Sequence, residues 1–418
     1  MLRMKSKTTY VLLLPLLLTF NARSVRADMS TLFGLSPRGI GMANAVSAVI
    51  DDYAAVYYNP AGLALSQESG FTLGYFYAQP RVKVSLEQGS PDEGFRSPLQ
   101  AGVFGYRQNL SFQKWKRSFV VGMALAYPDN LKTGTLVRTH LYDEMQFPVF
   151  GRAYQMLVMS GGFGIELHKR VYAGAGMRYA VTYSAQDIAL VMKLLEGEVL
   201  FKHVDVNADT EIQPVVGIIL KPWDRLHIAA VWRSGGAPVR IVGKGSGGAQ
   251  LGNFVLPISL DLNFQDFYTP DEVAGSVAYR PTDKFLVAFE ITYARWSKYD
   301  VPFGERPPGD PFSNIVIPRV GIEYSVSQYV KLQAGYYYQP SPVEASQPYT
   351  LYLDTDQHVF SGATELSWPL TRILEYPLRV HLYFQFQYLP HRSLDTVMGS
   401  TSIWGYITNI GATVQLRF

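Results

Sequence analysis

Large apolar residues alternate with small or weakly polar ones along most of the chain after residue 68, and this period of two predicts β-strands. From Phe119 to Tyr127, for example, the odd positions are large and apolar, whereas the even positions hold only Val, Gly and Ala. The second face of a soluble sheet would be strongly polar. Tyrosines repeatedly close the apolar face, as aromatic girdles do at a membrane surface. The pattern therefore predicts strands whose large apolar face contacts lipid.

The connections between these strands are short and long in turn, which is the asymmetry of bacterial outer-membrane barrels. An open sheet of this size would expose apolar edges, and closure into a barrel removes them. We therefore predict an all-β fold, a transmembrane antiparallel barrel of about 14 strands with both chain ends in the periplasm, and residues near 252–268 as an alternative extra strand. The predicted strands lie near 69–79, 98–109, 117–127, 151–167, 170–184, 208–220, 225–234, 256–280, 284–296, 314–325, 328–339, 356–367, 376–389 and 402–418.

Composition excludes several other classes of protein. Only 17% of the residues are charged, and Tyr (28) and Phe (23) are abundant, yet the mean hydropathy is near zero, which is too polar for a bundle of membrane helices. The chain has no cysteine, which removes thiolate metal sites and Cys nucleophiles. The sequence also lacks the Gly-x-Ser-x-Gly and His-Glu-x-x-His motifs. We therefore predict no catalytic residues, no metal and no cofactor.

The first 27 residues have the features of a secretory signal peptide. Three cations precede an apolar run from Tyr10 to Phe20, and the segment ends in the small-x-small pattern Val25-Arg26-Ala27. The run is too short to span a bilayer. Removal of residues 1–27 deletes five cations and no acid, which turns the formal net charge of +3 into about −2. No basic stripe remains, so nucleic acid is not expected as a partner.

Residues 28–68 interrupt the strand pattern and are rich in Gly and Ala, which predicts compact, mainly helical turns. The segment from Gly39 to Ala64 contains Gly-x-Gly-Met-Ala-Asn-Ala and then Asp-Asp-Tyr-Ala-Ala-Val-Tyr-Tyr-Asn-Pro-Ala-Gly-Leu-Ala. This arrangement resembles the N-terminal hatch of the FadL family of long-chain fatty acid and hydrocarbon transporters. Weaker likenesses follow in order at 221–234, 293–298 and 356–362. The resemblance implies a hatch over 28–68 that plugs the lumen of a barrel over 69–418.

The resemblance also implies a function, namely passive uptake of hydrophobic molecules across the outer membrane. In the family, an inward kink of the third strand opens a lateral window, and the Asn-Pro-Ala segment lies against it. On this chain the matching residues are Asn59, Pro60, Ala61 and Gly62, and Gly122 is the residue in the middle of the third predicted strand that can kink cheaply. We therefore expect these five residues to form a hatch-controlled gate for release into the bilayer.

Two further sets of residues are candidates for binding the hydrophobic solute. Ile188, Val191, Leu194 and Leu195 have helical spacing within a long loop, and an apolar helix there would form an extracellular capture groove like that of the family. The alternative is an extended strand that protrudes.

Arg178 and Arg319 fall on the inward faces of their strands. A lumenal arginine can hold a fatty carboxylate by a charge-assisted hydrogen bond. The alternative is that these arginines pair with Glu290 or Glu323 and simply satisfy the barrel interior.

The last predicted strand ends on an aromatic residue, Phe418, with an alternating apolar face before it. This resembles the signal that the bacterial barrel-assembly machinery reads, so that machinery and outer-membrane lipids are expected partners. A porin for small polar solutes is the alternative function. A porin requires an open lumen, whereas this chain devotes some forty residues to an apparent plug.

Overall fold

The structure is a computed structural model that describes most of the chain after residue 28. The first 28 residues, including the expected signal peptide, lie outside the described residues. The described residues are 29–86, 98–110, 117–128, 147–149, 157–181, 185–194, 197–210, 212–236, 239–251, 254–266, 268–299, 306–368 and 378–418.

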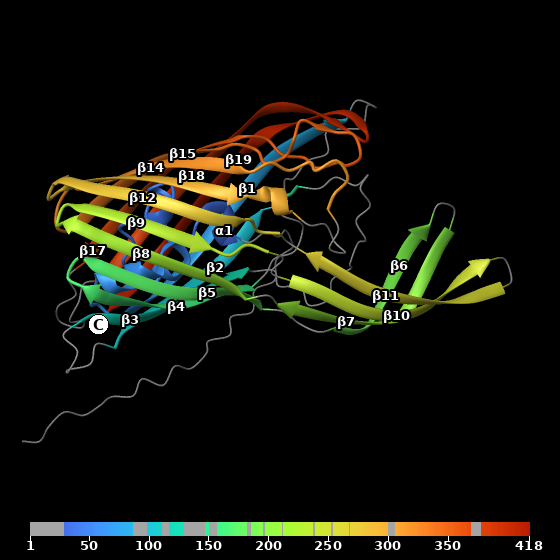
Figure 1. The fold of residues 1–418 in the computed structure, drawn as a ribbon, viewed down its shortest axis with the longest axis horizontal. Helices are drawn as coiled ribbons and strands as arrows, with labels where there is room; N and C mark the ends of the chain where they lie inside the picture. Colours follow the sequence, from blue (N-terminus) through green and yellow to red (C-terminus); the bar gives the residue numbers. More distant parts are fainter. Residues whose placement is uncertain are drawn as a thin grey trace, which may run out of the picture.

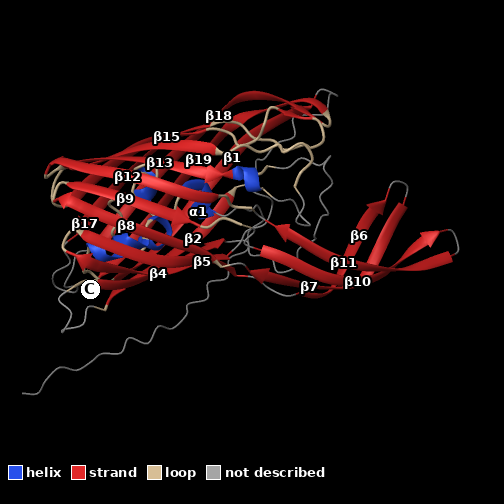
Figure 2. Ribbon diagram, viewed as in Figure 1, coloured by secondary structure: helices blue, strands red, loops and turns tan. Residues whose placement is uncertain are grey.

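The N-terminal segment folds into short helices inside the barrel (Figure 2). Its elements are α1 (Met29–Phe33), α2 (Pro37–Gly41), α3 (Ala55–Tyr58) and the 3₁₀ helix η1 (Pro60–Leu65). The sequence explains where α2 and η1 begin. Ser36 precedes Pro37 and accepts a hydrogen bond from the backbone N–H of Gly39, and Asn59 precedes Pro60 and accepts one from the backbone N–H of Ala61. A side-chain acceptor followed by proline is a favoured helix start.

Fourteen antiparallel strands surround this hatch and close into a barrel (Figure 1). Around the wall, each strand is hydrogen-bonded to the barrel strand that follows it in the sequence. The last strand, β19, pairs with both β18 and β1, which closes the barrel. The strands are β1 (Gly70–Leu86), β2 (Leu99–Asn109), β3 (Phe119–Pro128), β4 (Leu157–His168), β5 (Val171–Val181), β8 (Gln213–Trp223), β9 (Leu226–Arg233), β12 (Asp271–Thr282), β13 (Phe285–Arg295), β14 (Ile315–Ser325), β15 (Val330–Gln339), β17 (Gln357–Trp368), β18 (Leu378–Thr396) and β19 (Gly399–Arg417).

The seam of the barrel is long and regular. β1 pairs with β19 from Gly70↔Arg417 to Leu86↔Thr401 without a register shift. Closure leaves the sheet without a free edge, which is what a strand needs in a medium that offers no hydrogen bonds. The predicted all-β barrel with a small helical hatch is confirmed. A two-residue strand, β16 (Ser346–Gln347), adds a parallel pairing to the outer end of β18.

Large apolar side chains cover the outer face of the barrel, while small ones face the lumen. An exposed apolar surface of this extent is not found on soluble monomers, and it matches the hydrocarbon band of an outer-membrane barrel. The outer-membrane location predicted from the sequence is confirmed. The exposed side chains include Leu73, Ile218, Val277, Phe289, Ile291, Leu382 and Phe384, and the buried lumenal ones include Ala78, Ala101, Ala124, Ala229, Ala278 and Ala288.

Among the described residues, no helix combines the length and the apolar character needed to cross a membrane.

The predicted strand near 256–280 is two strands separated by a short connection. β11 (Phe254–Asp266) belongs to a separate four-stranded sheet, and β12 belongs to the barrel, so there is a further strand near 252–268 but it does not add to the strands of the barrel. The separate sheet has the order β11–β10–β7–β6 and consists of two hairpins inserted after β5 and after β9. Its other strands are β6 (Ala185–Leu194), β7 (Gly197–Thr210) and β10 (Val239–Leu251). In Figure 1 this sheet projects from the end of the barrel opposite the C-terminus.

The helix expected around 188–195 is wrong. Ile188, Val191 and Leu194 lie in β6, which pairs with β7, and Leu195 lies outside the described residues. The apolar residues at 188, 190, 192 and 194 have the period of two that a strand requires, and pairing with a neighbouring strand overrides the helical spacing of 188, 191 and 194. The extended, protruding segment that the sequence left open as an alternative is therefore the one observed.

Three wall glycines let the hatch pack against the backbone of the barrel. A Cβ atom at Gly174 would lie 2.3 Å from the backbone N of Ala61, and one at Gly217 would lie 2.1 Å from Oδ1 of Asn59. At Gly164 it would lie 2.6 Å from the carbonyl O of Pro60. The Asn-Pro-Ala segment is thus seated directly on the main chains of β4, β5 and β8.

We predict that Gly174→Val displaces the hatch and leaves the barrel intact. The new side chain would overlap hatch backbone, which costs roughly 1–3 kcal/mol for an overpacked site. Because the chain has no cysteine, Ser47→Cys supplies a single buried thiol in the hatch. Maleimide labelling of this thiol is expected to accelerate about tenfold or more in the Gly174→Val background. The control is Gly275→Val, because nothing lies within 4 Å of a Cβ there; equal labelling of both variants would contradict the packing.

Candidate functional site

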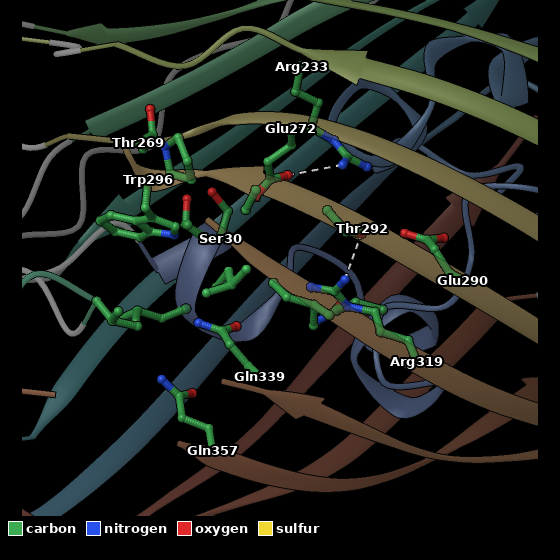
Figure 3. Close-up of a pocket in the computed structure, with 18 of the residues that line it drawn as sticks. Ser30, Arg233, Thr269, Glu272, Glu290, Thr292, Trp296, Arg319, Gln339 and Gln357 are labelled. Atoms are coloured by element: carbon green, nitrogen blue, oxygen red, sulfur yellow. Dashed lines mark hydrogen bonds and ion pairs between the residues drawn. The ribbon is translucent and has the colours of Figure 1, made fainter. Parts of the chain in front are cut away.

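A cavity of about 100 Å³ lies in the lumen between the hatch and the wall formed by β9, β12, β13 and β14 (Figure 3). The hatch contributes polar and aromatic side chains, and the wall contributes both charged and apolar ones. An engineered protein cavity of about 150 Å³ is large enough to hold benzene. The cavity in its present form is therefore smaller than a monoaromatic site, and a longer solute needs the hatch or the lining at the loop end of the barrel to move. The lining residues include Ser30, Asn44, Tyr57, Tyr58, Arg233, Glu272, Glu290, Thr292, Trp296, Ile317 and Arg319.

Arg233 at the end of β9 ties one side of the cavity to the hatch. Its Nη1 atom lies 3.2 Å from Oε2 of Glu272, and its Nη2 atom donates to the carbonyl O of Tyr58 at 2.7 Å. Figure 3 shows the pair with Glu272 on the upper side of the cavity. All of these contacts are internal to the fold, so Arg233 is a structural anchor.

Of the two described arginines that line the cavity, Arg319 on β14 is the one that makes no ion pair among the described residues. Its Nη1 atom donates to Oγ1 of Thr292 at 2.8 Å, and its Cζ atom lies 5.2 Å from the ring centre of Tyr337. Its Nε atom is buried without a hydrogen-bond partner among the described residues. Glu290 is its cross-strand neighbour but binds the backbone N–H of Ser47 instead. An incompletely satisfied guanidinium beside apolar side chains suits a molecule with one acidic or polar end and an apolar body.

Arg178 lies elsewhere on the wall. Its Nη1 atom is 3.3 Å from Oγ1 of Thr31 in α1, and Arg178 is not among the described residues that line the cavity. The expected alternative, in which the two arginines pair with Glu290 or Glu323, is not what the described residues show. Glu290 binds hatch backbone, and Glu323 pairs with Arg38.

Five aromatic rings form a roof at the loop end of the cavity. Tyr268 and Trp296 line the cavity and lie 5.8 Å apart, centre to centre. Phe312 lies between Tyr299, at 4.2 Å, and Tyr352, at 4.9 Å. These rings come from three separate connections, after β11, after β13 and after β15, which brings distant parts of the chain together. Such contacts add stabilisation beyond area burial, so the roof is a packed unit.

At the end of the barrel away from the aromatic roof, the hatch is held by a network of charged side chains. Arg38 in α2 reaches the wall and the hatch at once, with Nε 2.8 Å from Oε2 of Glu323 and Nη1 2.9 Å from Oδ1 of Asp51. Burial of Asp51 disfavours the charged carboxylate and raises its pKa. The Arg38 guanidinium outweighs this effect and holds the pKa of Asp51 well below its usual range, so this carboxylate stays ionised. Arg107 on β2 adds hydrogen bonds to the carbonyl O atoms of Asp51 and Leu63.

The sequence did not point to Arg38, Arg107 or Arg233 as anchors of the hatch. Arg107 and Arg233 fall on the inward faces of their strands, and a charged residue among small inward ones was an available signal. Arg38 carries no such signal, because Glu323 lies 285 positions away in the sequence.

No family model matches the chain. Alkane uptake protein A of Marinobacter nauticus is 24% identical over 399 residues, which cover 88% of this chain and 86% of that protein. The structure of the Pseudomonas putida toluene transporter TodX is similar with a TM-score of 0.62, 16% identity and coverage of 93% and 99% of the two chains. A Pseudomonas aeruginosa FadL homologue gives a TM-score of 0.58, 14% identity and coverage of 94% and 99%.

The chain has a FadL-like fold. The resemblance expected from the hatch sequence is thereby borne out across the barrel as well.

Within this FadL-like barrel, the five expected gate residues lie in one region but do not form one contact. Asn59, Pro60 and Ala61 rest on β4, β5 and β8, and Gly62 packs against Ile50 of the hatch. Gly122 on β3 faces Leu63 and Val56 instead, at 2.7 and 3.0 Å from the position of a Cβ atom. β3 is paired at Gly122 on both sides, with Arg107 and with Gly162, so the described part of β3 has no kink that opens the wall.

We predict that Arg38→Ala loosens the hatch without opening the barrel sheet. The substitution leaves Glu323, which is nearly fully buried, without its charge partner, and breaking a buried pair in this way costs about 3–5 kcal/mol. Hydrogen exchange of hatch amides, measured by mass spectrometry on the detergent-solubilised protein, is expected to accelerate about 100-fold or more. Arg225→Ala is the control, since its pair with Asp283 is exposed and contributes little. Unchanged hatch exchange in Arg38→Ala would refute the role of this network.

Proposed function

We propose that this protein is an outer-membrane transporter for passive uptake of hydrophobic molecules, namely long-chain fatty acids or related hydrocarbons. The observation that carries the proposal is a closed barrel whose lumen is filled by a hatch yet keeps a partly apolar cavity between hatch and wall. The names of the similar proteins, an alkane uptake protein and a toluene transporter, support the same class of solute. Those relatives are named as uptake proteins or transporters, which gives no support to an enzymatic role.

A stoppered lumen also argues against the porin alternative. A porin needs an open, water-filled path with charged rings. Here the hatch buries a continuous apolar core inside the barrel, including Phe33, Met42, Ile50 and Leu63. Apolar solutes gain nothing from a water path, because exposing apolar surface to water costs about 25 cal/mol per Å². A dry route past a hatch therefore suits apolar solutes better than polar ones.

Entry starts, in this proposal, at the sheet that projects beyond the barrel. The segment with Ile188, Val191 and Leu194 serves as part of the capture surface, as an extended strand and not as a helix, and Leu195 follows it outside the described residues. The barrel residues that follow this sheet in the chain lie beside the cavity: Gln213, at the start of β8, donates to Oγ1 of Thr269, which precedes β12 and lines the cavity. A solute that leaves the sheet then meets the aromatic roof.

Inside the cavity, Arg319 is the proposed contact for a polar end of the solute. Its incompletely satisfied guanidinium would donate hydrogen bonds to a carboxylate of the solute, while the neighbouring apolar side chains Ile315 and Ile317 contact the hydrocarbon part of the solute. Arg178 is the weaker candidate, because it already contacts Thr31 of the hatch.

Release into the bilayer is proposed through a thin part of the wall that the hatch covers. Gly122, Gly162 and Gly176 are paired in a row across β3, β4 and β5. Glycine in a strand lets another backbone approach closely and weakens the strand. Hatch residues Leu63 and Pro60 lie directly behind this row. A shift of the hatch would therefore leave a wall of bare backbone as the barrier to lipid.

Assembly of the barrel is proposed to involve the terminal residue. Phe418 is more than half exposed, and its backbone is bonded to Ser69 at the seam. It is thus accessible to the barrel-assembly machinery as the expected recognition residue.

The proposed role of Arg319 is tested with two solutes in one assay. Arg319→Met is expected to lower uptake of radiolabelled oleate about tenfold, because a charge-assisted hydrogen bond to a carboxylate is lost. Uptake of radiolabelled hexadecane, which has no polar end, is expected to stay within twofold. Arg225→Met, a surface cation on a turn, is the matched control. An equal loss for both solutes would show that Arg319 only supports the fold.

The proposed gate is tested at the glycine row. Gly122→Arg places a large charged side chain against Leu63 and is expected to abolish oleate uptake, while heat-modifiable migration on a gel shows that the barrel still assembles. Unchanged uptake by an assembled Gly122→Arg barrel would remove the gate from this position.

A further inference from the structure

Three neighbouring strands of the barrel, β18, β19 and β1, are longer than the others. They have 19, 19 and 17 residues, whereas the other strands of the barrel have 8 to 12. At the loop end, β2 pairs with β1 only as far as Ala78, and β17 pairs with β18 only as far as Tyr388. The residues beyond these points continue the outer wall past the neighbouring strands. We call them the extension, which consists of residues 79–86, 389–396 and 399–406.

The lengths of the three strands place the outer surface of the membrane at the base of the extension. A tilted transmembrane strand needs about 9–11 residues to cross the hydrocarbon. Counted from the turn end, the eleventh residues are Pro80 on β1, Tyr388 on β18 and Ile407 on β19. Tyr388 lies opposite Tyr406, and tyrosines favour the membrane interface. Outward-facing residues just beyond this level therefore lie among lipid headgroups.

Two cations occupy the first outward positions of β1 beyond this level. Arg81 lies opposite Tyr406, and Lys83 lies opposite Trp404. Both cations are exposed, and neither makes an ion pair among the described residues. A charge on the outer face of a barrel is unfavourable in the hydrocarbon and is tolerated near the interface. The chain thus presents two positive charges to the headgroup layer.

Acidic residues accompany other exposed cations at the loop end of the barrel but not these two. Lys298 lies 3.9 Å from Asp271, and Arg306 lies 3.8 Å from Asp310. On the described outward positions of the extension, the first acidic residue is Asp395. It is separated from Lys83 by a row of serines. The positive charge at the base of the extension is therefore left for a partner outside the chain.

The polarity of the outward face changes in three steps along β1. Leu73 and Tyr75, below the cations, are about half exposed and face the hydrocarbon. Above the cations, Ser85, Ser402 and Ser393 lie side by side on the three strands. The order is an apolar surface, then positive charge, then hydroxyl groups. A lipid with acyl chains, phosphate groups and a sugar headgroup has the complementary order.

We propose that Arg81 and Lys83 bind the phosphate groups of the phosphorylated glycolipid in the outer leaflet of the membrane. A guanidinium group can donate two parallel hydrogen bonds to a phosphate, and a lysine adds a compact positive charge. Clusters of such cations at a membrane surface attract anionic lipids. Trp404 provides an aromatic surface beside Lys83, and its ring centre lies 5.3 Å from that of His391. The acyl chains of the lipid lie below, along the outward face of β1, β18 and β19.

This site rests on the outer-membrane location of the barrel and not on the proposed uptake function. It lies on the outer face of the wall, whereas the cavity with Arg319 lies in the lumen. A bound glycolipid holds the extension at the membrane surface. A barrel that transports no hydrophobic molecule would bind the same lipid, so the two proposals can fail separately.

The test is a titration of the full-length protein in detergent with lipid A, in which native mass spectrometry counts the bound lipid molecules. The double variant Arg81→Gln/Lys83→Gln is expected to bind lipid A at least tenfold more weakly, because each cation near an anionic headgroup contributes about fivefold in affinity. The matched control is Lys298→Gln/Arg306→Gln, which removes one lysine and one arginine from the same end of the barrel. Its affinity is expected to stay within twofold of the wild type.

Dephosphorylated lipid A separates the contribution of the phosphates from that of the acyl chains. It is expected to bind the wild type at least tenfold more weakly than lipid A does, and to bind the double variant with the same low affinity. Heat-modifiable migration on a gel checks that each variant barrel is folded, and Arg81→Gln alone replaces the double variant if that one does not fold.

Two results would overturn the proposal directly, namely wild-type affinity for lipid A in the variant or equal affinity of the wild type for both lipids. Displacement of lipid A by an equal concentration of oleate would also overturn it, because the two cations would then belong to the path of the transported solute.

Discussion

The structure depends on one constraint, that backbone N–H and C=O groups inside a bilayer find no hydrogen-bond partner in lipid. The chain meets it by pairing every barrel strand on both sides, including the long seam between β1 and β19. Closure then fixes the alternation of side chains, with Phe289 and Ile291 facing outward and Ala288 facing inward. A closed barrel of fourteen strands leaves a lumen too wide for its own small side chains to fill, so the hatch fills it.

The hatch is held against the barrel wall by two kinds of contact. On the side of β4, β5 and β8 the contact is steric, because glycines such as Gly174 let hatch backbone lie on wall backbone. On the other side it is electrostatic and hydrogen-bonded, through Arg38 with Glu323 and through Arg233 with the Tyr58 carbonyl. Polar contacts of this kind contribute little to stability relative to apolar packing but fix one arrangement. The cavity lies between the hatch and β9, β12, β13 and β14, on the side where Arg233 binds the hatch.

Much of this fold follows from local sequence, because a strand that separates lipid from lumen needs one large and one small face. Alternation predicted a strand that overlaps each of the fourteen barrel strands, although it joined β12 to β11 of the separate sheet, and it correctly placed Arg319 on the lumenal side. Prediction from the apolar pattern was wrong where the same residues fit both a helix and a strand. Apolar residues of 188–194 fit a helix when counted in steps of three and a strand when counted in steps of two, and only pairing with β7 decides between the two structures. It also failed for contacts set by closure, such as Arg38 with Glu323, whose positions in the sequence carry no mark of each other.

The central claim is that a folded hatch seals the lumen of a membrane-spanning barrel. Single-channel recording of the purified wild-type protein in planar lipid bilayers tests it most directly, with a known open porin as the standard. A sealed barrel predicts near silence, interrupted at most by brief, small openings. Large and steady conductance steps from correctly folded protein would mean that water and ions pass freely, and would contradict the claim.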